Sequence, residues 1–200
     1  NFSDTTKANL TIVSSEFEKM YQNYYASGYS AGESVVTVDG YNDQTERENM
    51  SISGNQINEL EIGSTTHTLL FGAEMIDTSN KNKRYDTYWA TTKSDKETFN
   101  ITRPMNFLVN SVGVATNNDF SEDLNRHTQS DIEVTSIFFQ DQIDVSDKLK
   151  LLIGGRHDSF DITVKDIKNG SEQSREDKEF SPRAGIIFKP RENVSLYYSY

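Results

Sequence analysis

Residues 136–161, SIFFQDQIDVSDKLKLLIGGRHDSFD, contain two strand-like runs that are joined by a short polar turn. In the second run apolar and polar residues alternate, and the run continues into the charged residues Arg156, His157 and Asp158. A period of two predicts a β-strand whose two faces meet different environments. A soluble sheet usually carries such charges at a surface edge, whereas here they extend an apolar strand. The stretch therefore predicts part of the wall of an outer-membrane β-barrel.

The composition excludes several classes of protein. Asp and Glu number 31 against 20 Lys and Arg, so nucleic acid is not expected as a partner. There is no Cys in the sequence, which excludes disulfides and Cys-based metal sites. No apolar run approaches the roughly 18 residues of a membrane helix. The N-terminus lacks a basic and then apolar signal region, so we expect any export signal to lie outside this chain.

The mean hydropathy of −0.70 does not oppose a barrel, because only alternate residues of a transmembrane strand meet lipid. The pattern predicts an all-β fold, an antiparallel meander of about seven strands that forms part of a transmembrane β-barrel. The expected strands cover residues 7–24, 47–62, 67–78, 131–145, 149–166, 179–188 and 194–200.

The connections between these strands alternate in length. Transmembrane barrels have short periplasmic turns and longer extracellular loops, whereas a soluble sandwich distributes its loop lengths more evenly. The alternation therefore favours a barrel. The expected short turns lie at 63–66, 144–148 and 189–193, and the expected long loops lie at 25–46, 79–130 and 167–178.

The two faces of the later strands differ in polarity. Leu149 and Ile153 lie on one face of their strand, and Arg156 and Asp158 lie on the other. An Arg against lipid at the bilayer midplane would cost about 2–4 kcal/mol. We therefore expect the charged face, together with Arg183 on the next strand, to face the lumen and to pair across strands. A soluble sheet with one hydrated face would show the same alternation.

Four segments resemble the barrel of TonB-dependent outer-membrane receptors, especially the receptors for ferric siderophores. They follow one another in the order of that family across nearly the whole chain. They are residues 47–49 (REN), 67–75 (HTLLFGAEM), 138–161 (FFQDQIDVSDKLKLLIGGRHDSFD) and 179–200 (EFSPRAGIIFKPRENVSLYYSY).

This resemblance implies a 22-stranded transporter in the bacterial outer membrane, with an N-terminal plug in its lumen. The sequence shows neither the plug nor an energy-coupling box, so we interpret residues 1–200 as a partial barrel domain. The resemblance further implies uptake of a ferric siderophore. The expected partners are the siderophore, a TonB-type coupling protein that acts on the plug, and outer-membrane lipid.

The longest expected loop contains the candidate ligand-binding residues Arg84, Tyr85, Tyr88, Trp89 and Arg103. Aromatic faces combined with Arg suit a ferric catecholate or an anionic citrate complex. The alternative is that these residues pack the loop against itself.

Tyr21, Tyr24, Tyr25 and Tyr29 form a second candidate cluster, which is open to the same alternative. The sequence has no nucleophile elbow, phosphate-binding Gly loop or metal-spaced His motif. We therefore expect no enzymatic activity, no cofactor and no metal site.

Two other architectures remain open from the sequence. A soluble all-β adhesin or carbohydrate-binding module would close into a sandwich and need no membrane. A small complete barrel would need an even number of strands. A partial barrel instead predicts an open, curled sheet with two unpaired edges.

Overall fold

The computed structural model describes residues 5–102, 104–191 and 193–200, which form a single antiparallel sheet. Within these residues no helix is long and apolar enough to cross a membrane. The strands are β1 (Thr6–Ser30), β2 (Val35–Ile62), β3 (Thr65–Trp89), β4 (Glu97–Asn100), β5 (Asn118–Ser146), β6 (Leu149–Asp166), β7 (Ser171–Arg191) and β8 (Val194–Ser199).

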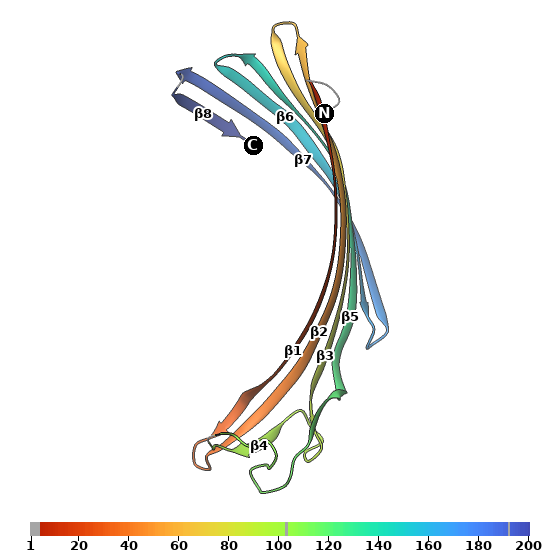
Figure 1. Ribbon diagram of the computed structural model, residues 1–200, viewed down its shortest axis with the longest axis vertical. Helices are drawn as coiled ribbons and strands as arrows, with labels where there is room; N and C mark the ends of the chain where they lie inside the picture. Colours follow the sequence, from red (N-terminus) through yellow and green to blue (C-terminus); the bar gives the residue numbers. More distant parts are fainter. Residues whose placement is uncertain (1–4, 103, 192) are drawn as a thin grey trace.

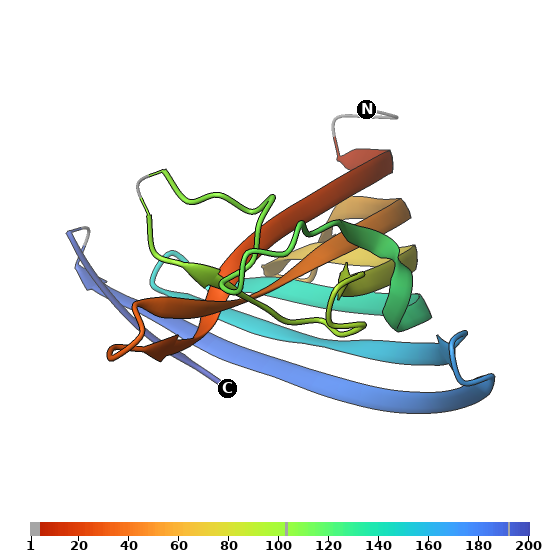
Figure 2. The same ribbon diagram turned by 90° about the horizontal axis from the view of Figure 1, so that it is seen from below.

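Seven of these strands are neighbours in chain order, β1-β2-β3-β5-β6-β7-β8. The sheet is long, curved and open, with β1 and β8 at its two edges (Figures 1 and 2). The β2–β3, β5–β6 and β7–β8 connections lie at one end, and the other connections lie toward the opposite end (Figure 1). The predicted all-β meander of seven wall strands is confirmed, and the soluble sandwich and the closed small barrel are wrong.

The remaining strand, β4, lies in the long connection between β3 and β5, residues 90–117, which we call the excursion. It pairs with the first residues of β2, from Val35 to Val38, where β3 no longer lies beside β2. Seen from below, the excursion lies across the end of the sheet (Figure 2). The excursion is therefore anchored to the wall by backbone hydrogen bonds.

The predicted strands were too short at one end of the sheet. Residues 25–46 were expected to form a long loop, but they contain a hairpin whose turn covers only 31–34. The expected loop at 79–130 shrinks to 90–117, and that at 167–178 shrinks to 167–170. These strand extensions carry many polar residues on both faces, so the alternation of apolar and polar residues that reveals a strand in a sequence is weaker than in the later strands. Backbone hydrogen bonds in the ladder hold them instead.

One face of the sheet carries an apolar band. Register places the members of this band side by side, because Ile12 pairs with Ile52, Ile52 with Met75, and Phe139 with Phe71. Their side chains are exposed to a third or more, as expected for a surface that meets lipid. The band includes Leu10, Ile12, Met50, Ile52, Phe71, Met75, Ile137, Phe139, Ile153, Ile186, Phe188, Leu196 and Tyr198.

The opposite face is polar and contains a tight ion network. Arg156 donates hydrogen bonds from Nε to Asp158 Oδ1 (2.7 Å) and from Nη2 to Glu74 Oε2 (2.8 Å) and Ser136 Oγ (2.8 Å). Arg183 lies on the same face and donates to Gln140 Oε1 at 3.4 Å. The prediction that Arg156, Asp158 and Arg183 share the polar face is confirmed, although Arg183 contacts an amide rather than an acid.

A close approach on the polar face requires glycine at position 72. A Cβ added to Gly72 would lie 2.2 Å from Phe138 Cζ and 2.9 Å from the Gly54 carbonyl oxygen. By contrast, a Cβ added to Gly54 would meet no heavy atom closer than 3.9 Å. The ring of Phe138 thus covers the space that a side chain at position 72 would need.

We predict that Gly72→Ala destabilises the full-length protein by about 1–3 kcal/mol, because the new methyl group forces the Phe138 ring and the strand apart. Gly54→Ala is the matched control and is expected to change stability by under about 0.5 kcal/mol. Thermal unfolding of the two purified variants in detergent measures the difference. Equal melting temperatures would show that the Phe138 contact imposes no constraint.

Candidate ligand-binding site

A hollow lies on the polar face, toward the end of the sheet that carries the excursion. Its volume is about 360 Å³. Tyr21 in this hollow is nine residues beyond Ile12 of the apolar band, which is about 30 Å along a strand. The hollow therefore lies far along the strands from Ile12, toward the end of the sheet that carries the excursion. It is lined by Lys19, Tyr21, Tyr41, Asp43, Thr45 and Asn82.

Strand register fixes the residues of this site. Tyr21 pairs with Asp43, Asp43 with Arg84, and Arg84 with Arg126. Directly paired residues of neighbouring strands point to the same face of a sheet. The register therefore forms a row of four polar and aromatic side chains across β1, β2, β3 and β5.

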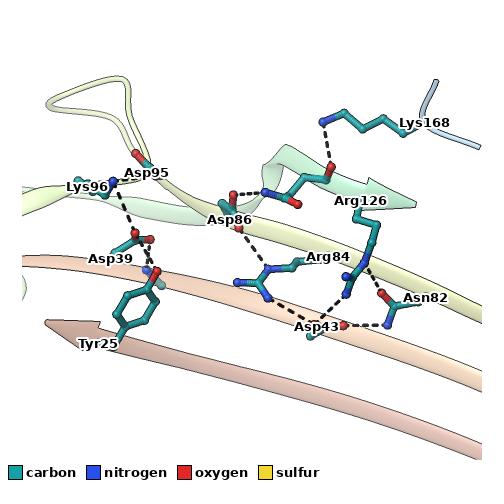
Figure 3. Close-up of polar contacts among 12 residues, drawn as sticks. Tyr25, Asp39, Asp43, Asn82, Arg84, Asp86, Asp95, Lys96, Arg126 and Lys168 are labelled. Atoms are coloured by element: carbon teal, nitrogen blue, oxygen red, sulfur yellow. Dashed lines mark hydrogen bonds and ion pairs between the residues drawn. The ribbon is translucent and has the colours of Figure 1, made fainter. Parts of the chain in front are cut away.

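Two guanidinium groups in this row converge on one carboxylate (Figure 3). Asp43 Oδ2 lies 3.7 Å from Arg84 Nη1 and 3.4 Å from Arg126 Nη2. Asn82 donates from Nδ2 to Asp43 Oδ1 at 2.9 Å, and its Oδ1 accepts from Arg126 Nε at 2.7 Å. Asp86 approaches Arg84 from the other side, with 3.5 Å between Oδ1 and Nε. The cluster thus alternates cations and acids.

Tyrosine rings flank the arginine cluster. The Arg84 guanidinium carbon lies 3.8 Å from the centroid of the Tyr41 ring, a cation–π contact. The Tyr41 ring in turn lies 5.9 Å from that of Tyr21 and 6.2 Å from that of Tyr25, between centroids. Together these rings provide π-faces next to positive charge.

Tyr25 connects the site to the excursion. Its hydroxyl donates to Asp39 Oδ2 at 2.9 Å, and Lys96 Nζ lies 3.9 Å from the same oxygen (Figure 3). The hydrogen bond to Asp39, and then burial, raise the pKa of Tyr25 above its usual value near 10. The phenol therefore stays protonated at neutral pH and remains a hydrogen-bond donor.

A small hydrophobic core lies on the opposite face at the same height. Trp89 and Phe99 are fully buried, with 5.1 Å between their ring centroids, and Tyr24 packs beside Trp89 at 6.1 Å. Burial raises the pKa of Tyr24, and a hydrogen bond from Asn118 acts against that shift. This core, with Val36 and Val38, attaches the excursion to the sheet.

A family model described as "TonB dependent receptor-like, beta-barrel" matches residues 1–200. The chain belongs to this family. Barrels of this family lie in the bacterial outer membrane, so the apolar band of this receptor barrel contacts lipid. No curated protein matches the sequence.

Solved receptors have the same fold at low sequence identity. Pseudomonas aeruginosa FpvA, solved with a heterologous pyoverdine and iron, is 15% identical with a TM-score of 0.79. BauA, the ferric preacinetobactin receptor of Acinetobacter baumannii, is 19% identical with a TM-score of 0.70, and the ferric citrate transporter FecA is 14% identical with a TM-score of 0.69. All of this chain is covered in each match, but only 24%, 28% and 25% of the respective receptor chains.

The receptor fold separates the predicted ligand-binding residues. Arg84 lies in the row on the polar face. Tyr85 is the next residue of β3, which pairs with β2 without a register shift here, so Tyr85 points to the other face, where Lys83 covers its ring. Trp89 belongs to the buried core, which supports the packing alternative for this residue. Tyr88 is half-buried at the end of β3, opposite Asp119. Arg103 lies outside the described residues.

The second candidate cluster also divides between two faces. Tyr21 and Tyr25 contact Tyr41 on the polar face, whereas Tyr24 packs against Trp89 and Tyr29 is largely exposed. No group of three or more His, Cys, Asp or Glu side chains in the described parts of the chain is placed to hold a metal ion.

The residues of the site that sequence reasoning missed include Tyr41, Asp43, Asn82 and Arg126. They were hidden because their segments were assigned to loops. The sequence did contain a sign of a strand here. The β-branched run at 35–38 is followed, at every second position, by Asp39, Tyr41, Asp43 and Thr45. Alternation of this kind places Tyr41 and Asp43 on one face.

We predict that Trp89→Ala loosens the excursion of the receptor. Truncation of a buried Trp leaves a cavity and costs about 3–5 kcal/mol, and this cost falls on the attachment of residues 90–117. Limited proteolysis of the receptor in intact outer membranes should therefore show faster cleavage within 90–117. Tyr29→Ala, which removes a ring that is 64% exposed, is the control and should leave cleavage unchanged. Equal cleavage of both variants would mean that the core does not hold the excursion.

Proposed function

We propose that this chain is part of a receptor that binds a ferric siderophore outside the cell and takes it up through the barrel in an energy-coupled step. Family membership and the receptor fold support this function, as do neighbours whose names include a ferric citrate transporter and a ferric preacinetobactin receptor. The main structural support for this function is the hollow, because it offers a ligand site beyond the apolar band. The hollow is lined by Tyr21, Tyr41 and Asp43 and lies beside Arg84 and Arg126.

The chemistry of the hollow fits an anionic iron chelate. The guanidinium groups of Arg84 and Arg126, which lie beside the lining residue Asp43, supply planar donors for carboxylate or catecholate oxygens. The rings of Tyr21 and Tyr41 supply π-faces for an aromatic ligand and for the arginines themselves. A ferric catecholate and a ferric citrate complex both combine negative charge with oxygen acceptors, so both are suitable ligands.

The proposal implies three partners, namely the ferric siderophore, a TonB-type coupling protein and outer-membrane lipid. Residues 1–200 act as part of a larger barrel domain, whose lumen holds a plug. A TonB-type coupling protein in the inner membrane supplies energy through that plug, and lipid surrounds the apolar band. The chain itself carries out no covalent chemistry, since its role is to bind the complex and provide a polar wall.

We predict that Tyr41→Ala weakens binding of ferric citrate and of a ferric tricatecholate complex to the full receptor. The loss should be about three- to thirtyfold, because the ring contributes both a ligand contact and support for the Arg84 guanidinium. Titration of the purified receptor and growth on each complex under iron limitation measure the effect.

Tyr85→Ala is a closely matched control for this experiment. Tyr85 lies on the neighbouring strand at almost the same height and also has a cation over its ring, 5.8 Å from Lys83 Nζ to the centroid, but it faces away from the hollow. Its variant should bind both complexes as the wild type does. If the two variants lose affinity equally, the hollow is not the ligand site.

A further inference from the structure

We propose that Asp43 is a built-in counter-anion of the binding site, which an anionic arm of the ligand displaces when it binds between Arg84 and Arg126. This inference rests on the proposed function, because it needs an iron chelate as the ligand. It adds a selection rule: the site favours complexes with several negative oxygens, because these oxygens have to compete with Asp43 for the two guanidinium groups.

Strand register places two arginines of the site next to each other. Arg84 and Arg126 are directly paired on neighbouring strands, and like charges in this position repel each other. Among the described side chains, Asp43 is the acid that approaches both guanidinium groups, at 3.7 Å and 3.4 Å. The carboxylate therefore offsets a repulsion that the fold itself creates, as a bound anion would.

The contacts between Arg84 and its acidic neighbours are long. Charge-assisted hydrogen bonds between a guanidinium and a carboxylate are normally about 2.7–2.9 Å long. Arg156 meets this standard with all three of its partners, at 2.7 to 2.8 Å. By contrast, Arg84 reaches its two acids only at 3.5 and 3.7 Å. A guanidinium has five N–H donors, so Arg84 keeps donor capacity for a ligand.

The three charged side chains are accessible to solvent. The side chains of Arg84, Asp43 and Arg126 are 29%, 23% and 47% exposed, and Asp43 lines the hollow directly. Ion pairs with this much solvent contact are weak, so a stronger anion can replace Asp43 at low cost. Once released, the carboxylate still has the amide of Asn82 as a hydrogen-bond partner.

The selection rule follows from charge. A chelate with carboxylate or catecholate arms can replace the carboxylate of Asp43 at both guanidinium groups and add further contacts. An uncharged chelate offers no replacement, so binding it would leave two repelling cations with the original acid. We therefore expect the ratio of the affinities for anionic and neutral ferric complexes to change when Asp43 is replaced.

The test is Asp43→Asn in the full-length receptor, titrated with ferric citrate, a ferric tricatecholate complex and an uncharged ferric trihydroxamate complex. Removal of the competing charge should tighten binding of the two anionic complexes by about three- to tenfold. The affinity for the uncharged complex should change by less than about twofold. If Asp43 served only to orient the arginines, the same variant would bind the anionic complexes more weakly, and that result would overturn the inference.

Asp86→Asn is the matched control for net charge. Asp86 also approaches Arg84, but Asn125 holds it with a 2.6 Å hydrogen bond. Its variant should tighten binding of the anionic complexes by less than about twofold. Equal tightening by both variants would mean that general charge, not displacement of Asp43, controls affinity.

Arg126→Gln provides a double-mutant cycle. The tightening caused by Asp43→Asn should be smaller in the Arg126→Gln background, because Asp43 then competes with the ligand for Arg84 alone. Asp43→Ser should tighten binding in the same way and replaces Asp43→Asn if that variant does not assemble. If wild-type and variant receptors bind none of the three complexes, the proposed function fails together with this inference. If the wild type binds and the Asp43 variants do not bind more tightly, only the inference fails.

Discussion

The antiparallel ladder is the constraint on which the rest of this structure depends. β2 and β3 pair without a register shift from Tyr41 and Asp86 down to Ile62 and Thr65. Because side chains alternate between faces, one register decides the orientation of every residue over this length. The same register that places Ile52 beside Met75 in the apolar band places Asp43 beside Arg84 in the hollow. The lipid surface and the candidate site are therefore two consequences of one pairing pattern.

Two arginines on the polar face show how geometry separates structural charges from available ones. Arg156 lies at the level of the apolar band and is satisfied by Asp158, Glu74 and Ser136 at short distances. A charged side chain in the middle of the wall needs oppositely charged partners close by, because an uncompensated charge with little solvent contact is costly. Arg84 lies beyond the band, has longer contacts and is stacked on Tyr41. The same side-chain chemistry thus stabilises the wall at one height and is free to bind at another.

The sequence predicted the strands best where one face meets lipid. In the apolar band the alternation is strong, so the hairpin around 144–148 was correctly placed, with β6 beginning at Leu149. Beyond the band many residues on both faces of the sheet are polar, and residues such as Asn42, Asp43 and Gln44 resemble a loop by composition. Their strand state comes from continuing hydrogen bonds to the neighbouring strands, which a local pattern does not record. For this reason the candidate site was only partly predicted, through Arg84, Tyr21 and Tyr25.

The sequence by itself determined the class of the protein, the order of the wall strands and the polarity of their two faces in the band, because these depend on local alternation and turn residues. The tertiary structure decided which aromatic and charged residues act together. Tyr85 and Trp89 are close to Arg84 in the sequence, yet they point to the other face. Tyr41, Asp43 and Arg126 are distant in the sequence but adjacent to Arg84 in space. Cross-strand register between distant segments creates these neighbours, and no local pattern contains it.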